Sequence, residues 1–416
     1  MRVAILSAYL PHRHVGHGGG ISTRNMVLHL GRLHEVTLIS LLRPGETGLD
    51  AEVSADLGVS VVALPFLDSG TQGAARLELI AGRAAAGIRG FLHGQPYYGA
   101  KYWSKGLSRD LCEAVTAAQP DVVLVEGMQM ILYLRDLSLL RDQGRLDCRL
   151  CLGSDELSSL PRLRQISRTR NPLRKLVLGH QASAWQRLQV QATHWADTTF
   201  CVTDQDRDLL LADGGRNCHT VPLGIDTTAI KPVWDPAPPT RLLFVGSFSH
   251  RPNREAVKFL LDRVWPNVAK CAQDTEMVLA GRGSRDFLDA HGGGDRSIKA
   301  MGYVEDLTDL YRRCRLFVAP LTEGGGIKIK ILEAMAHGIP VATTPLGAEG
   351  IVCAEDKALW IGEPDESFAT TIRRMLDSQD EATHRAIRAR TLIEERFGWP
   401  ALARRMSDLF SSSEGG

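Results

Sequence analysis

Short runs of β-branched and aliphatic residues alternate with longer amphipathic stretches along most of this chain, and this alternation restricts the fold more than any other feature. Strands are predicted at Val3–Leu6, Val36–Leu41, Val59–Leu64, Val122–Val125, Arg149–Leu152, Thr199–Val202, Arg241–Val245, Glu276–Ala280, Leu316–Ala319 and Pro340–Thr343. Helices are predicted between them, for example at 22–33, 75–92 and 107–118. Strand, helix, strand in this order is typical of parallel sheets with helices on both faces. The sequence therefore predicts an α/β fold with doubly wound, Rossmann-like sheets.

A proline-rich segment separates two halves of similar build. Residues 231–240 carry four prolines, and proline neither continues a helix nor sits inside a sheet. A chain of 416 residues has room for two or three domains of ~150 residues each. We expect an N-terminal domain at 1–230, a linker at 231–240 and a C-terminal domain at 241–397. Ligands of such sheets bind beyond the carboxyl ends of the strands, which makes the cleft between the domains the expected site.

Charge and composition exclude several classes of protein. Lys and Arg number 49 against 48 Asp and Glu, for a net charge of +1, so no overall attraction to nucleic acid is expected. No apolar run reaches the ~18 residues of a transmembrane helix, and polar residues follow Met1 too soon for a signal peptide. The eight cysteines lack zinc spacing and are expected to be free, buried thiols. A cytoplasmic location is expected.

A glycine-rich segment follows the first predicted strand. Gly18, Gly19 and Gly20 precede a predicted helix, where glycines let the backbone approach a ligand and the helix N-terminus attracts an anion. The segment lacks the pattern of a dinucleotide fingerprint. Taken alone, these glycines are equally consistent with a flexible connection that has no function.

The most informative segment is Ala319–Pro340. A predicted strand is followed by a loop at Gly324–Gly326 and then by a helix. Lys328 and Lys330 fall in the first turns of this helix, where cations oppose the helix dipole. An anionic ligand such as a pyrophosphate would resolve that conflict. The alternative is a surface ion pair between Lys330 and Glu333, which share a face of the helix.

The motifs of the second half, taken in order, resemble those of the retaining glycosyltransferases of the GT-B fold, family four. The matching segments are Val221–Asp226, Phe244–Ser247, Ala280–Gly283, Gly302–Asp306, Tyr311–Pro320 and Gly324–Gly338. The resemblance covers most of the chain and is strongest from Leu242 to Ile351. It implies two Rossmann-like domains that face each other across a cleft, with a final helix at 398–416 that returns to the N-terminal domain.

Within this resemblance, Glu333 matches the second glutamate of the family's Glu-x7-Glu region, which accepts hydrogen bonds from the nucleotide ribose. A carboxylate suits a vicinal diol because both hydroxyls donate. The first glutamate, which reads the donor sugar, is replaced here by Gly325. Glu323, two residues earlier, is a candidate substitute. The donor sugar is therefore left open.

The resemblance implies further contacts to a nucleotide-sugar donor. Where the family commonly has arginine this chain has Ser247, and Arg251 is the candidate replacement; the alternative is a loop arginine in solvent. Tyr303 would hold the nucleotide base, unless it is a core aromatic at a strand end. The donor-binding residues so implied are Gly18, Gly19, Gly20, Arg251, Tyr303, Val304, Gly324, Gly325, Gly326, Lys328, Lys330 and Glu333.

The implied activity is transfer of a sugar from a nucleotide diphosphate donor, a UDP- or GDP-sugar, to a glycan, lipid-linked or small-molecule acceptor, with retention of the anomeric configuration. The leaving phosphate would take the acceptor's proton, and Lys328 and Arg251 would stabilise its charge. The Asp-x-Asp sequences at 204–208 are interpreted as the first turn of a helix capped by Thr203 or Asp204. No permanently bound cofactor and no metal are expected. The alternatives are a nucleotide-sugar epimerase of the same fold and a non-catalytic binder.

One long segment differs in charge from the rest of the chain. Residues 157–196 contain seven Lys and Arg but no Asp or Glu, and they include Trp185 and Trp195. Such a basic segment fits peripheral contact with an anionic membrane, a grip on an anionic acceptor, or a solvated helix whose acidic partners lie elsewhere.

Overall fold

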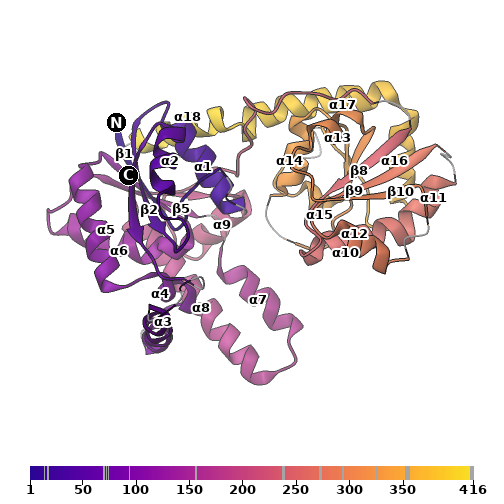
Figure 1. Cartoon of the computed structure of the whole chain (residues 1–416). Helices are drawn as coiled ribbons and strands as arrows, with labels where there is room; N and C mark the ends of the chain where they lie inside the picture. Colours follow the sequence, from indigo (N-terminus) through magenta and orange to yellow (C-terminus); the bar gives the residue numbers. More distant parts are fainter. Residues whose placement is uncertain are drawn as a thin grey trace. The chain divides into compact units, whose positions relative to one another are not determined.

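The computed structural model describes residues 1–13, 15, 18–68, 71, 73, 75–92, 94–154, 157–236, 239–270, 274–292, 295–324, 327–351 and 357–412. The chain divides into two compact units (Figure 1). The N-terminal unit comprises Met1–Pro222 and Leu402–Gly416, and the C-terminal unit comprises Leu223–Ala401. The first division therefore falls earlier in the chain than the boundary expected at residue 230.

The N-terminal unit is built on a seven-stranded parallel sheet with the order β3-β2-β1-β4-β5-β6-β7. Its strands are β1 (Arg2–Ser7), β2 (Glu35–Leu42), β3 (Ser60–Pro65), β4 (Val122–Glu126), β5 (Arg149–Ser154), β6 (Thr198–Cys201) and β7 (Cys218–Thr220). In the register of the sheet, Ile5 lies opposite both Leu38 and Leu124. The aliphatic runs of the central strands β1, β4 and β5 are buried because a parallel sheet is covered on both faces, whereas that of the edge strand β3 is partly exposed.

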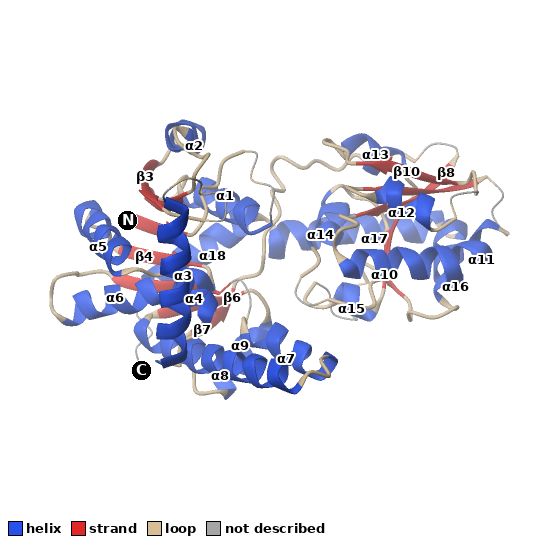
Figure 2. Cartoon of the chain, turned by 60° about the horizontal axis from the view of Figure 1, so that its bottom comes forward, coloured by secondary structure: helices blue, strands red, loops and turns tan. Residues whose placement is uncertain are grey.

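Helices flank the strands of this unit (Figure 2). They are α1 (Gly18–Leu30), α2 (Leu49–Leu57), α3 (Ala75–Leu92), α4 (Tyr97–Tyr102), α5 (Lys105–Ala118), α6 (Ile131–Asp142), α7 (Ser159–Arg168), α8 (Pro172–Trp195) and α9 (Asp204–Ala212). Tyr133 and Trp185 are the largest fully buried side chains of the core between helices and sheet. The end of α18 (Trp399–Ser411) packs here as well, since Phe410 lies beside Phe200 with ring centroids 5.9 Å apart.

The C-terminal unit has a six-stranded parallel sheet with the order β10-β9-β8-β11-β12-β13. Its strands are β8 (Thr240–Val245), β9 (Thr275–Ala280), β10 (Ile298–Gly302), β11 (Leu316–Ala319), β12 (Val341–Thr343) and β13 (Trp360–Ile361). Its helices are α10 (Arg251–Phe259), α11 (Trp265–Ala269), α12 (Ser284–Ala290), α13 (Thr308–Arg313), α14 (Ile329–Ala336), α15 (Pro345–Ala348), α16 (Phe368–Asp377) and α17 (Gln379–Leu392). Both sheets reverse their strand order beside the first strand, so the predicted pair of Rossmann-like domains is confirmed.

The proline-rich segment expected to be a linker is instead attached to the C-terminal unit. The backbone N–H of Val233 donates to the carbonyl of His337 at 3.0 Å, and that of Asp235 donates to Arg312 at 2.9 Å. The indole N–H of Trp234 donates to the carbonyl of Cys314 at 3.0 Å. The prolines prevent regular secondary structure in this segment. Its backbone N–H groups and the indole of Trp234 instead form hydrogen bonds with the rest of the C-terminal unit.

Candidate functional site

The candidate site lies at the carboxyl edge of the C-terminal sheet, where the strand order reverses between β8 and β11. Ligands of doubly wound sheets bind at this position. The segment after β8 begins at Gly246 and leads into α10, and the segment after β11 leads into α14. Gly325 and Gly326 lie outside the described residues, so the predicted glycine cradle is described only at Gly324, whose φ is +113°.

Two glycines let the ends of β8 and β9 approach each other closely. A Cβ atom on Gly281, whose φ is +136°, would lie 2.0 Å from the carbonyl oxygen of Gly246. A Cβ atom on Gly246 would lie 2.7 Å from Nδ2 of Asn253 and 2.9 Å from Nζ of Lys330. At Gly281 the clash is with backbone atoms, so only glycine fits, whereas at Gly246 the side-chain ends of Asn253 and Lys330 would have to move. Of the Gly-x-Gly sequence after β9, Gly281 is therefore required by backbone packing, whereas Gly283 is favoured by its left-handed conformation with φ +80°.

The ammonium group of Lys330 is held by an amide. Its Nζ donates to Oδ1 of the buried Asn253, whose Nδ2 donates to the carbonyl of Ser247 at 2.8 Å. The same Nζ lies 4.8 Å from the ring centroid of Phe244. Burial lowers the pKa of Lys330 to about 8, and the positive charge of Lys328 adds to the shift. Asn253 was not identified from the sequence, although its position two residues after the candidate Arg251 was the available signal.

Glu333 lies one helical turn after Lys330 on α14, and no ion pair joins the two side chains in the described part of the chain. The surface ion pair considered as an alternative is therefore wrong. Burial raises the pKa of Glu333 to about 7, and the hydroxyl of Tyr311 opposes the rise. That hydroxyl is buried and makes no hydrogen bond of ordinary geometry with a described residue, so its influence on Glu333 is that of a neighbour rather than a bonded partner.

Lys328 and Gly338 lie at the two ends of α14. Lys328 occupies the N-cap position, is 9% exposed, and has its Nζ 3.9 Å from the carboxylate of Glu349. At the other end Gly338 takes a left-handed conformation with φ +75°, which terminates the helix. Next to it, His337 stacks on Tyr311 with centroids 4.4 Å apart. The helix N-terminus and two lysines thus face the same edge of the sheet as Glu333.

Arg251 and Glu323, which were predicted separately, form an ion pair with Nη2 and Oε1 3.1 Å apart. Arg251 is not the loop arginine that was considered as the alternative: it is the first residue of α10, and its side chain is 57% exposed. A second carboxylate, that of Glu255, lies 4.0 Å from its Nε. The pair joins the segment after β8 to the segment after β11.

Tyr303 follows β10 and is 68% exposed, so its assignment to the core is wrong. The guanidinium of Arg282 lies 5.8 Å from the centroid of its ring. Val304, beside it, is only partly exposed. An exposed ring with a cation over its face at this edge of the sheet is available to stack on a planar group.

The predicted glycine loop of the N-terminal unit is helical. Gly18, Gly19 and Gly20 form the first turn of α1, because the helix begins earlier than the amphipathic pattern indicates. The hydroxyl of Thr23 donates to the carbonyl of Gly19 at 3.0 Å. Asp56 of α2, not identified from the sequence, pairs with arginines on both sides of these glycines, namely Arg13 and Arg24, and its pKa is lowered first by Arg13.

The Asp-x-Asp sequences lie in the first turn of α9. Thr203 is the N-cap residue, and its hydroxyl accepts the backbone N–H of Asp206 at 3.0 Å. Asp204 and Asp208 both pair with Arg207, at 2.7 and 2.8 Å. The described residues contain no group of three or more His, Cys, Asp or Glu placed to hold a metal ion. That the protein needs no metal stays a prediction.

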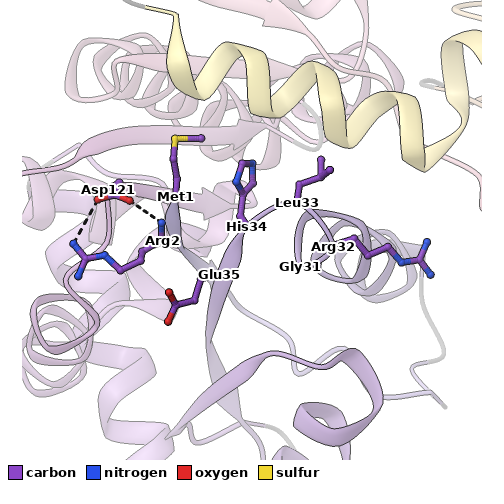
Figure 3. A pocket seen from close by; sticks show the side chains of 8 residues that line it. All are labelled: Met1, Arg2, Gly31, Arg32, Leu33, His34, Glu35 and Asp121. Carbon is purple, nitrogen blue, oxygen red and sulfur yellow. Dashed lines mark hydrogen bonds and ion pairs between the residues drawn. The ribbon is translucent and has the colours of Figure 1, made fainter.

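A pocket of about 430 Å³ lies at the opposite end of the N-terminal sheet, where β1 and β2 begin (Figure 3). The ion pair between Arg2 and Asp121 closes one side, and His34 reaches Ser407 of α18 at 3.0 Å. Because ligands of such sheets bind at the carboxyl ends of the strands, we do not assign the function to this pocket.

Comparison with known proteins gives sequence matches that include the C-terminal unit and structural matches over the whole chain. Residues 239–378 match the family model of group 1 glycosyl transferases. Phosphatidyl-myo-inositol mannosyltransferase of Mycobacterium leprae is 28% identical over 156 residues, which are 36% of this chain and 41% of that protein. The chain thus aligns with about two fifths of that relative's length.

The fold of the whole chain is shared with solved structures. Anabaena HepE in complex with UDP has a TM-score of 0.66 and 14% identity, covering 99% of this chain and 100% of that one. Sucrose-phosphate synthase from Thermosynechococcus elongatus has a TM-score of 0.67 and 16% identity, covering 98% of both chains. The chain therefore has the GT-B fold, and its match to the group 1 glycosyl transferases covers the segment that carries Lys330 and Glu333.

Proposed function

We propose that this protein is a glycosyltransferase that moves a sugar from a nucleoside diphosphate donor, a UDP- or GDP-sugar, to an acceptor with retention of the anomeric configuration. The observation that carries the proposal is the group on α14: Lys328, Lys330 and Glu333 lie partly or fully buried at the carboxyl edge of the sheet, within the segment that matches the group 1 glycosyl transferases. The complex of HepE with UDP supports a nucleotide-sugar co-substrate.

The charges of this group suit a diphosphate. Lys330 has no carboxylate partner among the described ion pairs, and its ammonium is held in place by Asn253. A diphosphate beside it would supply the missing negative charge and would also face the N-terminus of α14. As the bond to the sugar breaks, negative charge grows on the leaving diphosphate, and fixed cations lower the energy of that state most. The leaving phosphate then accepts the proton of the acceptor hydroxyl.

Glu333 would accept hydrogen bonds from the two hydroxyls of the ribose. It lies three residues after Lys330, so a nucleotide with its phosphates at Lys330 has its ribose one helical turn along α14. Tyr303 and Val304 would hold the base. Donation by the ribose would also favour the charged form of the carboxylate, whose pKa in the free protein is raised by burial to about 7.

Arg251 and Glu323 would respond to the donor together. In the free protein the guanidinium is paired with the Glu323 carboxylate at 3.1 Å. A donor phosphate would compete for Arg251 and release Glu323, which is the candidate for reading the sugar hydroxyls in place of Gly325. An exposed ion pair is worth little, ~0–1 kcal/mol, so the exchange costs little free energy.

The acceptor is proposed to bind the N-terminal unit, with Gly18, Gly19 and Gly20 near the donor sugar. A lipid-linked acceptor is supported by the relative whose name gives a phosphatidyl-inositol substrate. Peripheral contact with an anionic membrane through residues 157–196, in a cytoplasmic protein, agrees with that acceptor.

The proposal is tested in two steps. A thermal-shift screen against UDP-, GDP-, ADP- and dTDP-sugars should give one nucleotide that raises the melting temperature, because a ligand bound to the native state stabilises it. The best donor is then incubated with the protein and candidate acceptors, and the products are separated. Transfer to an acceptor supports the proposal. An isomerised donor would identify an epimerase, and a stabilising donor without turnover would identify a binding protein.

A further inference from the structure

Large apolar side chains are unusually exposed on two helices of the N-terminal unit. Among the described residues, eight large apolar side chains are at least 56% exposed, and six of them belong to α3 and α8. These six are Leu77 (72%), Ile80 (56%), Ile88 (62%), Leu173 (73%), Leu176 (71%) and Val177 (62%). We call them the α3–α8 surface. Single exposed apolar residues are ordinary, but six in two elements mark an interaction site.

The spacing places these side chains on one face of each helix. On α3, Leu77, Ile80 and Ile88 are separated by three and eight residues, and on α8, Leu173 and Val177 are four residues apart with Leu176 between them. Residues at such spacings share a helix face. In a water-soluble helix that face is normally turned toward the core. Here both faces are exposed.

The two helices border one groove. The groove has a volume of about 420 Å³ and is lined mainly by apolar atoms of Gly87 and Gly90 from α3, Tyr97, and Leu176 and Val177 from α8. Figures 1 and 2 both show α3 beside α8, while α7 and the start of α8 extend from the sheet as a helical hairpin. The two helices therefore lie side by side at this groove, although they come from segments far apart in the sequence.

Basic residues are interleaved with the apolar ones at the tip of this hairpin. Residues 170–177 are all exposed, and they include Arg170, Arg174 and Lys175. No Asp or Glu occurs anywhere from 157 to 196. A second copy of the chain docked on this face would bring cations against cations. An anionic lipid surface would instead complement both the charges and the apolar side chains.

We propose that the α3–α8 surface docks this protein on the interface of an anionic bilayer, with Leu173, Leu176 and Val177 among the lipid headgroups and Arg170, Arg174 and Lys175 on the lipid phosphates. The contact is peripheral. No described helix is long and apolar enough to span a bilayer. The inference rests on the proposed function only where it implies that the acceptor is carried by a lipid; the docking itself needs neither donor nor transfer.

Vesicle sedimentation of the full-length protein tests the docking. Vesicles of phosphatidylcholine alone are compared with vesicles that also contain phosphatidylglycerol, at low and high salt. The protein should bind the anionic vesicles and be released by salt. Replacing Arg170, Arg174 and Lys175 by serine should lower the partition coefficient roughly hundredfold, since each cation near an anionic surface contributes about fivefold.

The apolar residues are tested by two triple variants, L173S/L176S/V177S and L77S/I80S/I88S. Each should bind anionic vesicles at least tenfold more weakly even at low salt. The matched controls are Ile387→Ser, which removes an apolar side chain 61% exposed on α17, and K258S/K270S/R404S, which removes three exposed cations elsewhere. Neither control should change binding. In the wild-type protein, vesicles should slow amide hydrogen exchange at 170–180 and 77–88 without any substitution.

Several results would overturn the inference. Equal binding to neutral and anionic vesicles, no binding to either, or binding that survives both apolar variants would each exclude it. A dimer in sedimentation equilibrium that the apolar variants dissociate would assign the surface to a second copy instead. Because vesicle binding is measured without donor, a failure here is distinct from failure of the thermal-shift screen, which tests the proposed activity.

Discussion

Replacing Glu333 by a neutral residue is predicted to change the stability of the protein and its affinity for the donor in opposite directions. Burial raises the pKa of this carboxyl from 4.5 to about 7, and one pKa unit corresponds to ~1.4 kcal/mol. Keeping Glu333 charged in the folded protein therefore costs up to ~3 kcal/mol relative to the unfolded chain. The folded-state pKa is the higher one, so the penalty is absent below about pH 4.5 and grows as the pH rises toward 7.

Glu333→Gln removes the charge and keeps the shape. Because Glu333 is partly exposed and its surroundings relax, we expect the variant to gain on the order of 1–2 kcal/mol at pH 8 rather than the full amount. For a domain of this size that is an increase of about 3–6 °C in melting temperature. The gain should be much smaller at pH 5 and absent below about pH 4.5, since the wild-type carboxyl of the folded protein takes up a proton as the pH falls through about 7.

The same substitution should weaken binding of the donor. A neutral amide replaces a charged acceptor of the ribose hydroxyls, which should lower affinity about tenfold, and Glu333→Ala should cost on the order of 1.5–3 kcal/mol of binding. Calorimetry with the nucleotide found in the screen measures affinity, and melting curves at pH 5 and 8 measure stability. Glu363→Gln, an exposed acid of the same unit, is the control and should change neither. A variant that melts below the wild type at pH 8, or that binds donor normally, would refute the assignment.

Three further predictions concern the same edge of the sheet. Donor affinity should fall as the pH rises through about 8, where Lys330 loses its proton, and calorimetry should show no such fall in Lys330→Met. Gly281→Ala should destabilise the C-terminal unit by ~2 kcal/mol or more in melting curves, because the new Cβ would lie 2.0 Å from a carbonyl oxygen, whereas Gly292→Ala, with positive φ but open space around it, should cost less. Turnover should survive EDTA, since cationic side chains replace a metal at the diphosphate; loss on chelation with recovery on adding Mg²⁺ would contradict this.

Strands with a continuous aliphatic run could be predicted from the sequence, whereas three strands at the edges of the sheets could not. The ten predicted strands all occur, and nine of them lie inside a sheet, where a parallel strand is buried on both faces and has a continuous apolar sequence; the tenth, β3, is an edge strand. The three that were missed are β7, β10 and β13. Two of them, β10 and β13, lie at the edges of the C-terminal sheet, and β7 lies at an edge of the N-terminal sheet. Ile298–Gly302 alternates between partly buried and exposed residues, which leaves little apolar pattern to detect.

The residues of the candidate site could be predicted where they lie close together in the sequence on one helix. The lysines at the N-cap and in the first turn of α14, the acid one turn later and the glycine that ends the helix all follow from positions along one helix. The partners that come from other elements were not predictable. Asn253 reaches Lys330 across 77 residues, and Tyr311, which lies near Glu333, belongs to a different helix, α13. Pairing across that distance is set by the sheet order, which no local pattern encodes.

The energetics of this edge also support a functional rather than a merely structural role for it. Elsewhere in the C-terminal unit, charged groups are paired at little cost: Glu276 accepts from Arg241 and Lys299, and its pKa falls accordingly. On α14 both shifts run the other way, since burial favours the neutral forms of Lys330 and Glu333. A structural site would evolve toward an apolar pair of similar volume, which is often as stable or more so. Lys330 and Glu333 are two buried ionisable groups that do not pair with each other, and together they lower the stability of the free protein. The ammonium suits a phosphate and the carboxylate suits hydroxyl groups. A ligand that carries both a phosphate and hydroxyls would therefore restore the lost stability.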